Sequence, residues 1–79
     1  MAVAPPRLGV VAAFDADRGL GTVRGEDGRE WSFHCARISD GSRSVEVGQA
    51  VAFIVGPGAP GQWEAVSVVK AQLAPPPGR

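Results

Sequence analysis

The residues with reactive side chains in this chain are few, and their spacing argues against catalysis. His34 and Cys35 are its single histidine and single cysteine. Neighbouring side chains in a strand point to opposite faces, so we expect this pair to diverge and not to form a Cys–His catalytic dyad. One cysteine and one histidine also cannot make an internal disulfide or supply an ordinary four-ligand zinc site. We therefore predict no metal centre here.

Two other short patterns fit turns better than chemistry. Asp15 and Asp17 precede Arg18, and acidic residues so placed are typical of Asx turns rather than of a catalytic carboxylate pair. The segment 19–21 (Gly-Leu-Gly) lacks the third glycine and the following helix of a dinucleotide-binding loop. We expect no enzyme activity and no cofactor.

Composition points to one small domain that acts through its surface. The chain has 79 residues, and its eight basic and eight acidic side chains cancel. This balance argues against a strongly basic nucleic-acid tail or a polybasic membrane anchor. No apolar run approaches the roughly 20 residues of a membrane helix, and no secretion signal opens the chain. We expect a cytoplasmic protein without a membrane partner, too small for both a deep pocket and an intact core.

The residue pattern in the middle of the chain predicts short strands separated by turns. Strand patterns occur at 8–14, 19–24, 31–35, 51–55 and 63–69, with turn or loop signals at 27–28, 39–44 and 56–61. Alternation predicts Trp31, Phe33 and Phe53 in the core, with Ser32 and His34 facing outward. Five such strands favour a closed antiparallel barrel, of the oligonucleotide-binding (OB) or the SH3-like type. Composition further predicts a disordered lead-in at 1–6, the barrel at 7–70 and a proline-rich tail at 71–79.

Three segments together resemble the bacterial cold-shock domain. Residues 9–23 are similar to its opening, Gly-Lys-Val-Lys-Trp-Phe-Asn-x-Glu-Lys-Gly-Phe-Gly-Phe-Ile. Residues 30–38 are similar to its Asp-Val-Phe-Val-His-Phe-Ser-Ala-Ile, and residues 44–53 to its Thr-Leu-x-Glu-Gly-Gln-x-Val-x-Phe. The resemblance covers about residues 8–70. It implies an all-β, five-stranded antiparallel barrel of the OB-fold type.

The resemblance also implies a function, and this chain departs from the family at the residues that carry it. Cold-shock domains bind single-stranded nucleic acid by stacking bases on outward aromatic rings, with lysines nearby. Small or aliphatic residues stand at most of those positions here, and two lysine positions hold apolar residues. The replacements are Ala13, Leu20, Thr22, Ser32 and Cys35 for the rings, and Val10 and Ala12 for the lysines.

We accordingly expect binding of single-stranded RNA or DNA, weak and with little sequence preference, because each lost base–ring stack is worth ~1–3 kcal/mol. Trp63 is interpreted either as a relocated stacking residue or as a cover for the end of the barrel. The alternative function is a protein-interaction or self-association module, a homodimer included, that has lost nucleic-acid binding. The candidate nucleic-acid-binding residues are Phe14, Arg18, Leu20, Thr22, Ser32, His34, Gln62 and Trp63.

Overall fold

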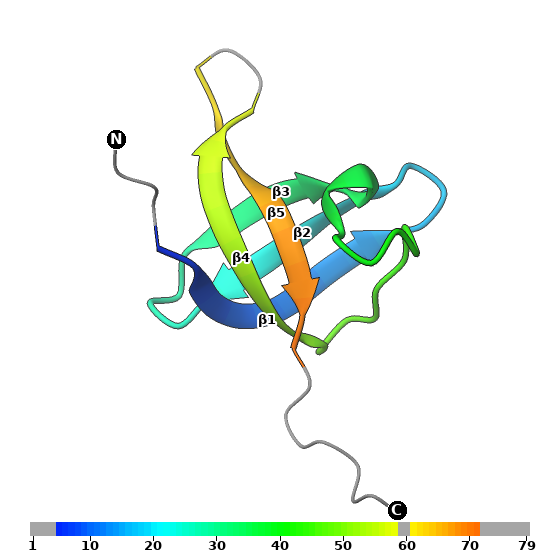
Figure 1. Cartoon of the computed structure of the whole chain (residues 1–79), viewed down its shortest axis with the longest axis horizontal. Helices are drawn as coiled ribbons and strands as arrows, with labels where there is room; N and C mark the ends of the chain where they lie inside the picture. The colour runs from blue at the N-terminus through cyan, green and yellow to red at the C-terminus, as the bar shows by residue number, and fades with distance from the viewer. Residues whose placement is uncertain (1–4, 59–60, 72–79) are drawn as a thin grey trace, which may run out of the picture.

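Five antiparallel strands make up most of the computed structural model (Figure 1). The structure describes residues 5–58 and 61–71. The predicted disordered lead-in at 1–6 and tail at 71–79 fall largely outside these residues. A short 3-10 helix, η1, follows the third strand. The elements are β1 Arg7–Asp15, β2 Leu20–Gly25, β3 Glu30–His34, η1 Cys35–Arg37, β4 Ala50–Pro57 and β5 Trp63–Lys70.

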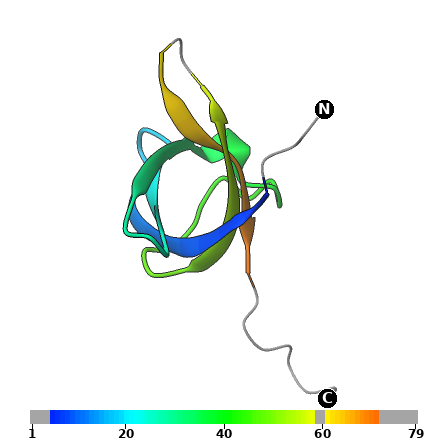
Figure 2. The same cartoon turned by 90° about the vertical axis from the view of Figure 1, so that its left-hand side faces the viewer.

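The strands form one sheet in the order β3-β2-β1-β4-β5, which curls into a barrel (Figure 2). The prediction of five antiparallel strands is confirmed. Full closure by hydrogen bonds is not observed, because the described residues contain no ladder between β3 and β5. Instead, the Ser39 N–H donates to the Val68 carbonyl at 2.8 Å, and an isolated parallel bridge pairs Ile38 with Val68. The segment after β3 therefore covers the free edge of β5.

The core lies inside the barrel and follows the strand alternation. Phe33 and Phe53 are each 1% exposed, which confirms their predicted place. Trp31 also packs against the core, as predicted, but it lies at the edge of the core and remains half-buried. The Arg7 guanidinium carbon lies over the Trp31 ring, 5.5 Å from the ring centroid. The other buried apolar residues are Val11, Val23, Ile38, Val45, Val51, Ala65 and Val68.

Gly21 allows the Phe33 ring to lie directly on β2. Gly21 is paired with Phe33 in the sheet, and a β-carbon at Gly21 would be 2.5 Å from Phe33 Cζ. Such a distance is far inside van der Waals contact, so any larger residue would push the ring away. The Gly-Leu-Gly segment thus has a packing role.

The predicted loop at 56–61 begins later than expected. Gly56 and Pro57 belong to β4, where they pair with Glu64 and Trp63 of β5. Gly56 is buried because the Val66 side chain covers it, 3.1 Å from where its β-carbon would be. Proline is tolerated at a strand end, where its missing N–H costs no ladder bond. Residues 59–60 of this predicted loop lie outside the described part of the chain.

Candidate nucleic-acid interface

Four of the predicted site residues meet on the outer side of β2 and β3. Leu20 lies opposite His34, and Thr22 lies opposite Ser32. Ala13 of β1 pairs with Thr22 on its other side, because a bulge between Val11 and Ala13 resets the register there. Thr22 is half-buried and the rest are exposed. We call this surface the outer platform: Ala13, Leu20, Thr22, Ser32 and His34.

Phe14 borders the outer platform but is turned toward the core. Its ring stacks on Phe33 with centroids 6.1 Å apart and planes 10° from parallel, and it is half-buried. Phe14 shares a shallow surface hollow of about 340 Å³ with Leu20, Thr22 and Ser32. Its partly exposed ring is the one aromatic group lining this hollow.

His34 and Cys35 lie closer together than the sequence predicted. Cys35 begins η1 instead of continuing β3, so the strand alternation ends at His34. The Cys35 Sγ and His34 Nδ1 atoms are 3.9 Å apart, and the expected divergence is wrong. His34 Nδ1 also accepts the Ala36 N–H at 3.0 Å and so caps η1. This bond leaves Nε2 of the neutral ring as the donor.

Two arginines flank the end of the outer platform where Leu20 pairs with His34. Arg18 immediately precedes Gly19, Arg37 ends η1, and the Cys35 N–H donates to the Gly19 carbonyl at 2.7 Å, joining the two segments. The Arg18 side chain is 76% exposed and only 3.9 Å from the Asp15 carboxylate. Arg37 forms no ion pair within the described residues. Arg37 comes to this end of the outer platform because η1 follows β3 directly.

The opposite end of the outer platform is closed by a neutral ion pair. The Nε and Nη2 atoms of Arg24 donate to Glu30 Oε2 at 3.0 and 2.8 Å. Arg24 and Glu30 are cross-strand partners on β2 and β3. Because this arginine is already paired with Glu30, it is less available to an anionic ligand than the unpaired Arg37.

Trp63 and Gln62 lie apart from the outer platform. Trp63 is 63% exposed and lines a second hollow of about 550 Å³ with Pro5, Arg7, Trp31 and Val55. We call this the tryptophan hollow; it shares no lining residue with the hollow beside Phe14. Gln62 is exposed, and its carbonyl accepts the Gly58 N–H at 3.1 Å. The predicted site residues therefore form two groups and not one face.

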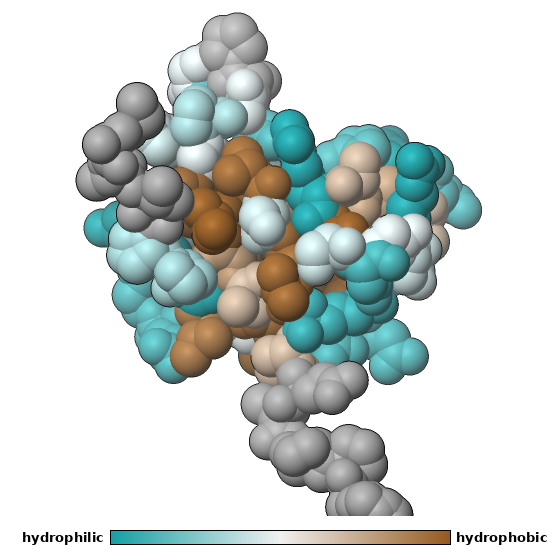
Figure 3. All heavy atoms as spheres, in the orientation of Figure 1, coloured by the Kyte–Doolittle hydropathy of each residue, from teal (hydrophilic) through white to brown (hydrophobic). Residues whose placement is uncertain are grey.

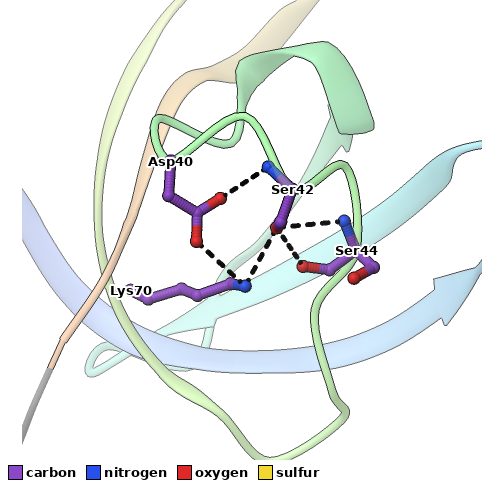
Figure 4. A network of polar contacts seen from close by, with 4 residues as sticks. All are labelled: Asp40, Ser42, Ser44 and Lys70. Atoms are coloured by element: carbon purple, nitrogen blue, oxygen red, sulfur yellow. Dashed lines mark hydrogen bonds and ion pairs between the residues drawn. The ribbon is translucent and has the colours of Figure 1, made fainter.

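A polar network fixes the segment that connects η1 to β4 (Figure 4). Lys70 Nζ lies 3.1 Å from the Asp40 carboxylate and donates to Ser42 Oγ at 3.0 Å. The Ser42 N–H donates to Asp40 Oδ1 at 2.9 Å. These hydrogen bonds, from Ser42 first and then from Lys70, lower the pKa of Asp40 to about 2. The network joins the loop that follows Arg37 to the last strand.

Neither a membrane span nor a metal cluster is found in the part of the chain that the structure describes. No helix there is long and apolar enough to cross a bilayer. No group of three or more His, Cys, Asp or Glu side chains is arranged to hold a metal ion within those same residues.

Comparisons with known proteins agree with this architecture. "Cold shock protein 1" of Lactiplantibacillus plantarum is 44% identical over 46 residues, which are 57% of this chain and 70% of that protein. A solved structure described as drosophila Unr CSD456 superposes with a TM-score of 0.72 at 21% identity, a level that indicates the fold. It covers 89% of this chain, which spans 28% of that longer one. The family model described as "'Cold-shock' DNA-binding domain" matches residues 7–71. The chain therefore belongs to the cold-shock domain family, a family of nucleic-acid-binding domains.

Proposed function

We propose that this protein binds single-stranded RNA or DNA weakly, and with little sequence preference, across the outer platform. The observation that carries the proposal is the pairing of Leu20–His34 and Thr22–Ser32 on one exposed surface of a cold-shock domain. Phe14 offers a partly exposed ring at the border of this surface, and His34 Nε2 offers a hydrogen-bond donor. Bases contact this surface through their faces more than through their edges, which accounts for the low sequence preference.

The affinity is weak because the outer platform itself carries no Phe, Tyr or Trp ring. Each base–ring stack contributes ~1–3 kcal/mol in single-strand binders. Losing two such stacks lowers the affinity by a factor of about 30 to 2 × 10⁴, since 1.4 kcal/mol is tenfold. A surface built from Leu20, Thr22 and Ser32 supplies aliphatic contact and hydroxyl groups instead. We therefore expect dissociation constants above about 10 µM.

Arg18 and Arg37 supply the phosphate contacts in this proposal. Both are exposed, and both lie at the same end of the outer platform. Arg18 is 3.9 Å from the Asp15 carboxylate, and Arg37 has no ion pair within the described residues. Two or three phosphate contacts give a slope of about −1.4 to −2.1 for log affinity against log salt concentration on single strands. Raising the salt from about 50 to 200 mM should then weaken binding about 7- to 18-fold.

Titration of a labelled dT oligonucleotide, followed by fluorescence anisotropy at several salt concentrations, tests this proposal. We expect a saturable signal whose salt slope falls by about 0.7 in Arg37→Gln. Arg29→Gln is the matched control, because Arg29 lies in the β2–β3 turn with its Nε 3.8 Å from Asp27. No saturable binding at low salt would overturn the proposed function. Equal slopes in the two variants would remove Arg37 from the interface.

Trp63 provides a second stacking point in the tryptophan hollow. Its indole is 63% exposed, and a hollow of about 550 Å³ falls within the roughly 300–1,000 Å³ of small-ligand sites. Trp63→Ala should weaken oligonucleotide binding about 5- to 150-fold if a base stacks there. Trp63→Phe keeps a ring and should bind nearly as the parent chain does. Unchanged affinity in Trp63→Ala would mean that Trp63 only covers the barrel mouth.

A further inference from the structure

The tryptophan hollow is a second candidate site, built from residues that the outer platform does not use. Its lining residues are Pro5, Arg7, Trp31, Val55 and Trp63, and its volume is about 550 Å³. Val55 belongs to β4 and Trp63 begins β5, the two strands over which apolar side chains gather in Figure 3. What this hollow binds is therefore a separate question from the binding of single strands across β2 and β3.

The polar side-chain groups that line the hollow are all hydrogen-bond donors. The Trp63 indole has one N–H and the Arg7 guanidinium has five, and neither group accepts a hydrogen bond. Trp31 Nε1 is buried and has no hydrogen-bond partner within the described residues. Pro5 and Val55 have no polar side-chain atom. These side chains therefore match a ligand that brings acceptors and apolar surface but no donors.

A run of prolines has this complementary chemistry. Proline has no backbone N–H, so consecutive prolines present carbonyl acceptors and apolar rings without donors. They favour the polyproline II helix, which has no internal hydrogen bonds, and aromatic-lined grooves bind such preformed segments. A nucleobase can stack on Trp63, but its edge also carries donors, for which the lining side chains offer no acceptor. The hollow as a whole fits prolines better than bases.

The chain itself carries two segments of this composition. Residues 4–7 read Ala-Pro-Pro-Arg, and residues 74–79 read Ala-Pro-Pro-Pro-Gly-Arg. Pro5 of the first segment lines the hollow, so the fold already places one proline ring there. The second segment lies outside the described residues and contains the longest proline run of the sequence. It is the proline-rich occupant that this chain supplies.

The prolines at 75–77 cannot reach the hollow of their own copy. β5 runs from Trp63 to Lys70, so the chain leaves this strand about 23 Å from Trp63. The Ala71 N–H still donates to the Ala50 carbonyl at 2.9 Å, so a turn back toward Trp63 begins no earlier than residue 72. With a two-residue turn, residue 77 returns no further than Val68, about 16 Å short of Trp63. The prolines that enter one hollow therefore come from another copy.

We propose that the tryptophan hollow binds the prolines at 75–77 of a second copy. Their rings lie against the Trp63 indole, and their carbonyl oxygens accept hydrogen bonds from Trp63 Nε1 and the Arg7 guanidinium. The contact is heterologous, because one copy contributes the hollow and the other contributes the proline-rich segment. Only three prolines enter the hollow, so the association is weak and reversible. It leaves the outer platform free in both copies.

Sedimentation velocity of the full chain, at concentrations from about 10 µM to 1 mM, tests the proposal. We expect the weight-average sedimentation coefficient to rise with concentration. Trp63→Ala, and separately the triple variant Pro75→Ser, Pro76→Ser, Pro77→Ser, should each raise the dissociation constant about 10-fold or more. Val47→Ala is the matched control, because Val47 is 64% exposed but does not line the hollow. It should associate as the parent chain does.

An equal mixture of Trp63→Ala and the triple variant gives the decisive result. One variant keeps the proline-rich segment and the other keeps the hollow, so the mixture should associate although neither variant does alone. Circular dichroism checks that both variants are folded. A mixture that stays monomeric overturns the proposal, as does association that survives either variant.

A synthetic Ala-Pro-Pro-Pro-Gly-Arg peptide, titrated into the triple variant, tests the hollow directly by tryptophan fluorescence. We expect a saturable change that a control peptide with three serines in place of the prolines does not produce. A parent chain that stays monomeric up to about 1 mM overturns the proposal. Peptide binding in that case would mean that the hollow takes a proline-rich segment of a different protein.

Discussion

Restoring one aromatic ring to the outer platform should restore much of its affinity for single strands. Ser32 is the position of choice, because its side chain is exposed at the centre of β3 and lies opposite Thr22. Phenylalanine is well tolerated on a strand surface, so Ser32→Phe should fold with little change in stability. The new ring would stand beside the hollow that Phe14, Leu20 and Thr22 line.

The expected gain follows from the energy of one stack. A base–ring stack is worth ~1–3 kcal/mol, which corresponds to about 5- to 150-fold tighter binding. The salt slope should not change, because the substitution leaves Arg18 and Arg37, and hence the number of phosphate contacts, unaltered. A gain in affinity at constant salt slope is therefore the signature of stacking.

Fluorescence anisotropy with a labelled dT oligonucleotide measures both quantities. Ser32→Leu is the matched control, because leucine adds apolar area without a ring and should gain far less than phenylalanine does. Ser39→Phe controls for position, since Ser39 is also exposed but lies beyond η1. If folded Ser32→Phe binds no more tightly than the parent chain, β2 and β3 do not contact the bases and the outer platform is not the interface.

Two further predictions concern stability. The pKa of Asp40 falls from its ordinary 3.8 to about 2, so its network stabilises the fold fully above pH 3.8 and loses this effect as the pH falls toward 2. Urea unfolding between about pH 5 and 2 should show a steeper loss of stability in the parent chain than in Asp40→Asn. Identical pH profiles in the two chains would show that Asp40 does not cause this pH dependence. Gly21→Ala should lower the free energy of unfolding by about 1–3 kcal/mol, because the added methyl meets the Phe33 ring. Ala36→Gly, at an exposed position in η1, is its control, and an unchanged midpoint in Gly21→Ala would show that the ring moves freely.

The strands and most of the core could be predicted from local pattern. Alternation is a property of the extended backbone itself, so the inward Phe33 and Phe53 and the outward Ser32 and His34 follow from the order of residues. Alternation fails where the chain leaves the strand. Cys35 turns into η1 and approaches His34, and Gly56 continues β4 because its pairing with Glu64 outweighs its weak strand preference.

The candidate sites also have features that follow from the sequence and features that only the tertiary structure decides. The sequence by itself determined that the outer platform carries no Phe, Tyr or Trp ring, since this depends only on which residue stands at each strand position. Only the tertiary structure decided that Trp63 lies with Trp31 in a separate hollow. It likewise joined the segment that holds Arg18 to the one that holds Arg37, through the hydrogen bond from the Cys35 N–H to the Gly19 carbonyl. Such neighbours are far apart in the chain, and the register and bulges that join them depend on how the whole sheet curls.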